Sequence, residues 1–155
     1  MSDNKNNLEL VKDMLYGNKN QVPLSENELM SVCLTYPAAL VAAADGNVDE
    51  AERLYLLNIS ESLDDEVEEI GKNPSSRLAA AERYRAFMWL LNNKYMADSL
   101  ILEGIKEFIE INQATGNQIK EMMWSMAGVS DGVSKEEEAE ITRICVALNI
   151  NETLN

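Results

Sequence analysis

The chain has 155 residues, of which 46% are hydrophobic and 26% are charged. A domain of this length buries roughly 68–70% of the surface that its unfolded chain exposes, so a single domain with a substantial core is expected. The formal net charge is −14. Nucleic acid and anionic membranes are polyanions that bind through Lys and Arg, so this charge argues against both as general partners. It favours cations, basic partners or simply high solubility.

Histidine is absent from the sequence. Its absence removes the commonest general acid–base residue and the imidazole ligand of most zinc sites. A metal site in this chain must therefore use oxygen ligands, which favours calcium, magnesium or manganese. Paired carboxylates can act as acid and base, but no nucleophile motif or phosphate-binding loop accompanies them here. We therefore expect a protein without enzymatic activity.

Targeting features and cysteines point to the cytoplasm. Residues 1–7 lack the apolar core of a signal peptide, and the longest apolar run, at 37–44, is far shorter than the roughly 20 residues of a membrane span. Cys33 and Cys145 lie among apolar residues at helical spacing, which favours buried free thiols over a disulfide. We expect a cytoplasmic protein with no direct membrane insertion.

Apolar residues recur every three or four positions along most of the chain, and no stretch shows the sustained alternation of a strand. The pattern predicts an all-α fold, a compact single-domain bundle of about seven helices. Residues 1–23 are expected to form an N-terminal helix, ending near Gly17, and a loop. Residues 24–155 then form the main helical domain.

The second predicted helix begins at a capping box, in which Ser25 and Glu28 bind each other's backbone amides. Its apolar positions continue to Ala44, but Pro37 lies inside it. Because proline lacks the N–H that a helix interior needs, we expect a kink or a short break near Tyr36.

An acidic segment follows the third predicted helix, whose apolar stripe covers residues 51–59. The acidic run at 64–69 has few apolar residues, so we expect a separate short exposed helix or turn that ends at 71–74. A long fourth helix begins near residue 75. Its apolar stripe is predicted to consist of Leu78, Ala81, Tyr84, Met88 and Leu91.

On this fourth helix, Arg83 and Arg85 are expected beside Tyr84 at a solvated edge. Three further helices complete the predicted bundle. Their inward residues are expected to be Ile101, Ile105, Phe108 and Ile109; Ile119, Met122, Met123 and Met126; and Ile141, Ile144, Cys145 and Leu148. The three methionines are interpreted as core or, alternatively, as an adaptable docking groove.

One pattern occurs twice, at residues 43–52 and 129–138. Each segment reads as the end of one helix, an Asp-Gly turn, a valine, a capping residue and the start of the next helix. Aligned on the valines, the two differ by one residue inserted at Asn47. The fold is therefore predicted to contain two pseudo-symmetric helix–acidic turn–helix corners.

Local chemistry accounts for most of each corner. Gly46 and Gly132 lie where a helix must end, and glycine readily adopts the left-handed conformation that such an end requires. The capping boxes are predicted to be Asp49 with Glu52 and Ser134 with Glu137. These roles explain the four capping residues without any ligand.

Asp45 and Asp131 are less easily explained, because a carboxylate near the negative end of a helix dipole is mildly unfavourable. One explanation is an Asx-turn hydrogen bond across the corner. The other is coordination of a cation shared between the corners. An EF-hand loop is rejected, since its first and third ligand positions would fall on Val41 and Ala43, which supply no side-chain oxygen.

If the two halves pack about a pseudo-twofold axis, the corners meet and their carboxylates form one cluster. The candidate metal ligands are then Asp45, Asp49, Glu52, Asp131, Glu137 and Glu138. Such a cluster would repel itself unless cations or protons neutralised it. The expected cofactor is a divalent cation (calcium, magnesium or manganese), or otherwise none.

The repeated pattern of helix, Ala-Asp-Gly, valine, glutamate and helix, on residues 42–52 and 130–137, resembles the tellurite-resistance TerB family and its relatives, which include the N-terminal domain of the DjlA co-chaperone. The similarity covers residues 25–150. It implies a compact, cytoplasmic bundle of about seven helices that acts in a stress or metal-ion response as a binding or scaffold protein. It also implies acidic corners that bind metal and no enzymatic activity.

The resemblance assigns functional residues to Asp45 and Glu52 in the first corner, and to Asp131 and Glu137 in the second. The second corner departs from the pattern, because Ser130 replaces the alanine before the aspartate and one residue is missing after the glycine. The two half-sites are therefore not equivalent in sequence.

A second interpretation treats the corners as helix caps alone. The protein is then an acidic interaction module or scaffold that docks a basic protein partner, through the run at 64–69 or the face at 136–140. Both interpretations expect a protein partner and no nucleic acid.

Overall fold

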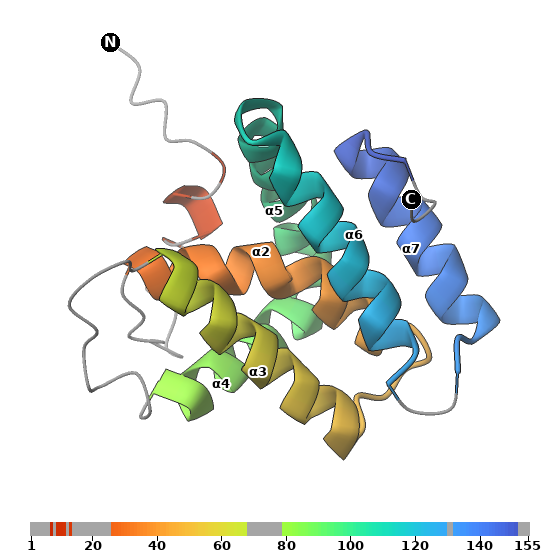
Figure 1. Ribbon diagram of the computed structural model, residues 1–155. Helices are drawn as coiled ribbons and strands as arrows, with labels where there is room; N and C mark the ends of the chain where they lie inside the picture. Colours follow the sequence, from red (N-terminus) through yellow and green to blue (C-terminus); the bar gives the residue numbers. More distant parts are fainter. Residues whose placement is uncertain are drawn as a thin grey trace, which may run out of the picture.

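The computed structural model describes residues 7, 9–11, 13, 26–67, 79–129 and 132–151. Within these residues every regular element is a helix (Figure 1). The helices are α2 (Glu26–Ala42), α3 (Glu50–Val67), α4 (Ala79–Asn92), α5 (Lys94–Ile111), α6 (Gln113–Ala127) and α7 (Lys135–Leu148). Residues 7, 9–11 and 13 are also helical and precede them. The prediction of an all-α bundle is confirmed.

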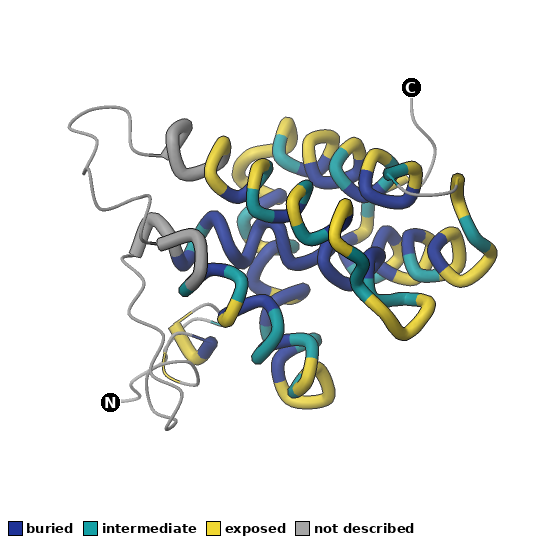
Figure 2. The backbone as a smooth tube through the Cα atoms, turned by 90° about the horizontal axis from the view of Figure 1, so that it is seen from below, coloured by how far each residue is buried: buried dark blue, intermediate teal, exposed yellow. Residues whose placement is uncertain are grey.

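Helix α2 is the centre of the bundle. It contacts α3, α4, α5, α6 and α7, and Figure 1 shows it crossing the middle of the molecule. Every residue from Ser31 to Ala42 is buried, and Figure 2 shows buried segments gathered in the middle and exposed ones on the outer faces. A helix that is apolar on all sides is stable only when neighbours cover all of it, and five helices do so here.

Pro37 does not break α2, contrary to the expected short break. The helix runs without interruption from Glu26 to Ala42 with Pro37 inside it. Proline still removes one backbone hydrogen bond. Because Pro37 and its neighbours are buried by other helices, packing keeps the chain helical on both sides of the missing bond.

The sequence predicts a separate short element at the acidic run 64–69. This prediction is wrong, because α3 continues through Val67. No glycine or proline lies between Asn47 and Val67, so nothing in the backbone ends the helix before the acidic residues. Residues 68–69, together with the expected helix end at 71–74, lie outside the described part of the chain.

The buried face of α4 is shifted by about one residue from the predicted face. This shift corresponds to a rotation of roughly 100° about the helix axis. Tyr84, Met88 and Leu91 are only half-buried. The buried residues of this helix are Arg83, Ala86, Phe87 and Leu90. The interpretation of Arg83 as part of a solvated edge is therefore wrong, since its side chain is 0% exposed.

The apolar stripes of the last three helices lie largely as predicted. Phe108 and Met122 are half-buried and pack against the core. The fully buried residues of these stripes are Ile101, Ile105 and Ile109 in α5, Ile119, Met123 and Met126 in α6, and Ile141, Ile144, Cys145 and Leu148 in α7. Trp89 and Trp124 also pack against this core as half-buried side chains.

Cys33 and Cys145 are both buried and free, as expected, so they form no disulfide with each other. Burial raises the pKa of the Cys33 thiol to about 12, which keeps it protonated and unreactive at neutral pH. No helix in the described part of the chain is long and apolar enough to cross a membrane. Gly17, the loop that follows it, and Ser25 lie outside the described residues.

Candidate functional site at the two acidic corners

The first corner joins α2 to α3 through a tight turn. Asp45 is exposed, and its Oδ1 accepts a hydrogen bond of 3.1 Å from the backbone N–H of Asn47. This is the Asx-turn that the sequence left as one of two explanations for Asp45. Gly46 has a φ of +95°, in the left-handed region that glycine favours, as predicted for the end of a helix.

A capping box then starts α3. The backbone N–H of Asp49 donates to Oε1 of Glu52 at 2.9 Å, and the N–H of Glu52 donates to Oδ1 of Asp49 at 2.8 Å. Each side chain therefore satisfies a backbone amide that the first turn of the helix leaves unpaired. The predicted capping role of both residues is confirmed.

The second corner repeats this chemistry with a hydroxyl in place of one carboxylate. The N–H of Ser134 donates to Oε1 of Glu137 at 2.9 Å, and the N–H of Glu137 donates to Oγ of Ser134 at 3.1 Å. Gly132 has a φ of +81°. Asp131 and Ser130, which complete this corner in sequence, lie outside the described residues.

The charges of the two capping glutamates interact. Glu52 is 3% exposed and Glu137 is 5% exposed, so both carboxylates are buried. Burial raises the pKa of Glu52, the backbone hydrogen bond from Asp49 lowers it, and the negative charges of Asp49, Asp45 and Glu137 raise it further. The charge of one corner thus acts on the buried carboxylate of the other.

Helix packing explains this approach. Helix α2, which ends at the first corner, contacts α6 and α7, which flank the second. Figure 1 shows both turns on the same side of the molecule, at the lower right. The fold therefore gives the molecule one acidic end, to which both corners contribute.

The described carboxylates of the two corners do not form a metal-binding site. Among the described residues, no group of three or more Cys, Asp and Glu side chains could hold a metal ion. Glu138 is exposed, and its backbone carbonyl accepts a hydrogen bond of 3.1 Å from the hydroxyl of Thr142. The six-carboxylate cluster stays a prediction, because Asp131 belongs to it.

Divalent cations differ in the number of protein oxygens that they need. Calcium takes six to eight oxygen ligands, more than the described side chains supply, whereas magnesium keeps several waters and binds through one or two carboxylates. Glu52 and Glu137 each use Oε1 in a cap, which leaves Oε2 outside the capping box.

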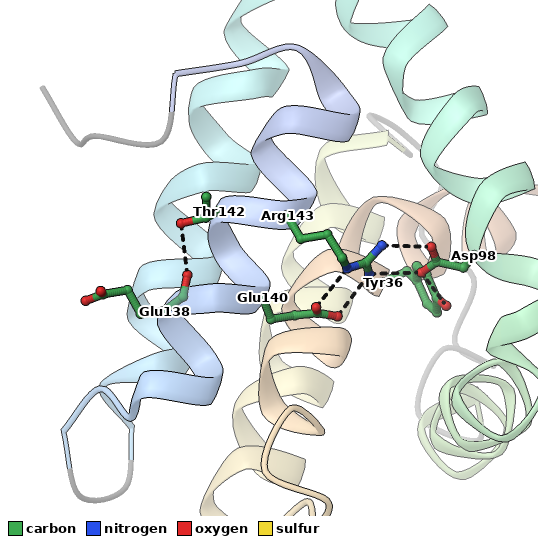
Figure 3. Close-up of polar contacts among 6 residues, drawn as sticks. All are labelled: Tyr36, Asp98, Glu138, Glu140, Thr142 and Arg143. Atoms are coloured by element: carbon green, nitrogen blue, oxygen red, sulfur yellow. Dashed lines mark hydrogen bonds and ion pairs between the residues drawn. The ribbon is translucent and has the colours of Figure 1, made fainter.

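The structure contains a second network of polar side chains, which the sequence did not predict (Figure 3). Arg143 of α7 donates to both oxygens of Asp98 of α5, at 3.1 and 3.3 Å, and to both oxygens of Glu140, at 2.8 and 2.9 Å. The hydroxyl of Tyr36 in α2 donates to Oδ1 of Asp98 at 3.4 Å. The network joins three helices.

Two groups of this network have a raised pKa, Tyr36 and Arg143. Burial and then the charge and hydrogen bond of Asp98 raise the pKa of Tyr36, so its hydroxyl stays neutral. Hydrogen bonds to Glu140 and Asp98 raise the pKa of Arg143. Within this network every charge has a partner, so the arrangement fastens α7 to α5 and α2. Glu140, expected on an exposed docking face, is half-buried in it.

No protein-family model, curated protein or solved structure matches this chain. The TerB resemblance therefore rests on the residues of the two corners.

Proposed function

We propose that this chain is a cytoplasmic, non-enzymatic binding protein of the tellurite-resistance TerB type, whose paired corners attract a divalent cation. The supporting observation is that Glu52 and Glu137 are both buried and that the charge of Glu137, after burial and the charges of Asp49 and Asp45, contributes to the raised pKa of Glu52. Two like charges held away from water destabilise each other, and a cation between them removes that cost.

Glu52 and Glu137 would hold the ion, and Asp49 and Asp45 would add to the negative potential around it, since both already act on Glu52. Asp131 is assigned to the same site from its place in the second corner. Once bound, the cation would supply charge neutralisation and a link between two helix starts. In a stress or metal-ion response of the TerB type, such a link would couple ion level to the stability of this end of the molecule.

The experiment compares thermal melting in magnesium, manganese or calcium with melting in chelator. A cation that binds only the folded chain stabilises it by about 2.7 kcal/mol at one hundred times its dissociation constant, or roughly 5–10 °C for a domain of this size. The variant Glu52→Gln with Glu137→Gln keeps both capping boxes, because glutamine caps as glutamate does, and removes both charges.

This variant should lose the ion-dependent shift. A matched control, Glu103→Gln with Glu110→Gln, removes two exposed carboxylates from α5 and should keep it. Unchanged melting of the wild-type chain in millimolar ions would overturn the proposal. A shift that both double variants retain would place the ion elsewhere.

A second candidate is an acidic interaction module whose corners are purely structural. It is favoured by the hydrogen bonds that Asp45, Asp49, Glu52 and Glu137 all accept from backbone amides of their own corners. Capture of a basic partner that survives Asp45→Asn with Asp131→Asn, but is lost on charge reversal at 65–69, would support this candidate over the first.

A further inference from the structure

A groove of about 240 Å³ lies between α3 and α6, away from the residues of both capping boxes. Its wall on α3 is made by Tyr55, Ile59 and Ser62. Its wall on α6 is made by Gln118, Glu121, Met122 and Ser125. Positions separated by three, four and seven residues lie on one face of a helix, so each wall is one helix face about two turns, or about 10 Å, long.

Three lining residues form the apolar part of the groove, and the other four are polar or charged. Tyr55, Ile59 and Met122 are half-buried and pack against the hydrophobic core, so their outer surfaces face the groove. An amphipathic helix that docks into a groove presents apolar residues at i, i+4 and i+7, which also span two turns. Methionine adapts its shape to such partners. Of the three methionines singled out in the sequence, Met123 and Met126 are core, and Met122 alone lines this groove.

The charge at the groove is negative. On α3 the exposed Glu61 adjoins the lining residue Ser62 in sequence, and the one basic residue of this helix, Arg53, is paired with Glu50. That guanidinium is held by two hydrogen bonds of 2.7 Å to Glu50 and lies 5.6 Å from the ring centroid of Tyr84 on α4. The one basic residue of α6, Lys120, is 4% exposed. Among the described lining residues there is one carboxylate, Glu121, and no basic side chain.

We propose that this groove binds a basic amphipathic helix of a protein partner. The apolar face of that helix lies on Tyr55, Ile59 and Met122, and its flanking Lys and Arg side chains face Glu121. Negative charge accelerates the encounter and selects a basic partner, while Tyr55, Ile59 and Met122 supply the apolar contact area. The inference names the surface for the interaction-module candidate and does not depend on a cation at the corners.

The test uses a fluorescein-labelled synthetic peptide of about 18 residues, or five helical turns, with leucines on one face and Lys and Arg beside them. Fluorescence anisotropy in chelator measures its affinity for the full chain. One comparison peptide has the same composition with the leucines scattered around the helix. Another has glutamate in place of Lys and Arg. Only the basic amphipathic peptide should bind tightly; equal binding of the scattered peptide would overturn the proposal.

Matched variants locate the site. Glu121→Arg and Ser125→Arg place a positive charge in the groove on exposed positions, and each should weaken binding by about tenfold or more. Glu103→Arg and Ser99→Arg make the same charge changes at exposed positions of α5, and each should change the affinity less than about twofold. Equal effects in groove and control variants, or no binding of any peptide, would reject the groove as the docking surface.

Two more variants separate this inference from the function proposed above. Glu52→Gln with Glu137→Gln should leave peptide binding unchanged, because these residues lie outside the groove lining. Charge reversal at 65–69, the change that tests the interaction-module candidate, should also weaken peptide binding through slower association. Binding that required both glutamates at the corners would move the docking surface there and overturn the assignment to α3 and α6.

Discussion

The buried carboxylate of Glu137 acts on the buried carboxylate of Glu52, although the two residues start different helices far apart in the sequence. Each glutamate also accepts a backbone hydrogen bond that fixes the first turn of its helix. The same residues therefore stabilise the two helices locally and repel each other across the fold. This opposition makes the stability of this end of the molecule depend on the protonation of Glu52.

The stability of the chain should depend on pH through Glu52. Its pKa in the folded chain is raised above the ordinary value of 4.5, so the folded state binds the proton more tightly than the unfolded state does. The corresponding stabilisation is present below the unfolded pKa and is lost as the pH rises through the folded pKa. Glu52→Gln should remove this loss, so the variant should exceed the wild type in stability at neutral pH but not at pH 4.

Urea unfolding across this pH range measures the difference, with Glu103→Gln, at an exposed position of α5, as the control. The prediction would be contradicted by a difference in stability between the wild type and Glu52→Gln that stayed constant with pH.

The two capping boxes should differ in their response to truncation. Loss of an N-cap side chain costs about 1 kcal/mol, so Ser134→Ala should destabilise the chain by that amount. Asp49→Ala should cost less, because it also removes a negative charge that acts on Glu52. Denaturant midpoints at constant slope measure both values, and an equal or greater cost for Asp49→Ala would count against the repulsion.

The two corner glycines should resist substitution for a reason of backbone conformation alone. Gly46 and Gly132 have positive φ, and a Cβ built on either meets no atom within 4 Å. Alanine should therefore cost about 1 kcal/mol at each position through left-handed strain without any clash. Asparagine should cost less. Gly128→Ala is the control, since Gly128 has a φ of −91° and only ordinary contacts there.

Tyr36 and Asp98 should be energetically coupled. Tyr36→Phe leaves Asp98 paired with Arg143 and should cost about 0.5–1.5 kcal/mol. Asp98→Ala leaves a buried hydroxyl without its acceptor, and should cost about 1–3 kcal/mol in addition to the lost pair with Arg143. A double-mutant cycle between the two should give a coupling of about 0.5 kcal/mol or more, and additivity would mean that their 3.4 Å contact contributes nothing.

The local features of both corners could be read from the sequence because each depends on residues within a few positions of one another. The Asp49–Glu52 and Ser134–Glu137 boxes span three residues, and a glycine at the end of a helix signals positive φ by itself. The stripes of α5, α6 and α7 were predictable for a related reason, since helical period alone brings their apolar residues to one face.

Features that depend on neighbouring helices escaped prediction. Pro37 stays within an unbroken α2 because five helices surround it, and Arg83 is buried because α4 is turned toward the core on Ala86, Phe87 and Leu90. The Glu140–Arg143 pair has a readable helical spacing, but its partner Asp98 lies on another helix and could not be found from the sequence.

The sequence by itself determined that the fold is helical, which residues cap the starts of α3 and α7, and how negative the molecule is. Only the tertiary structure decided that Glu52 and Glu137 interact, that Tyr36 reaches Asp98, and that α3 and α6 leave a groove between them. The physical reason is that capping and helical period are local, whereas the charge felt by a buried carboxylate and the space between two helices depend on how the whole bundle packs.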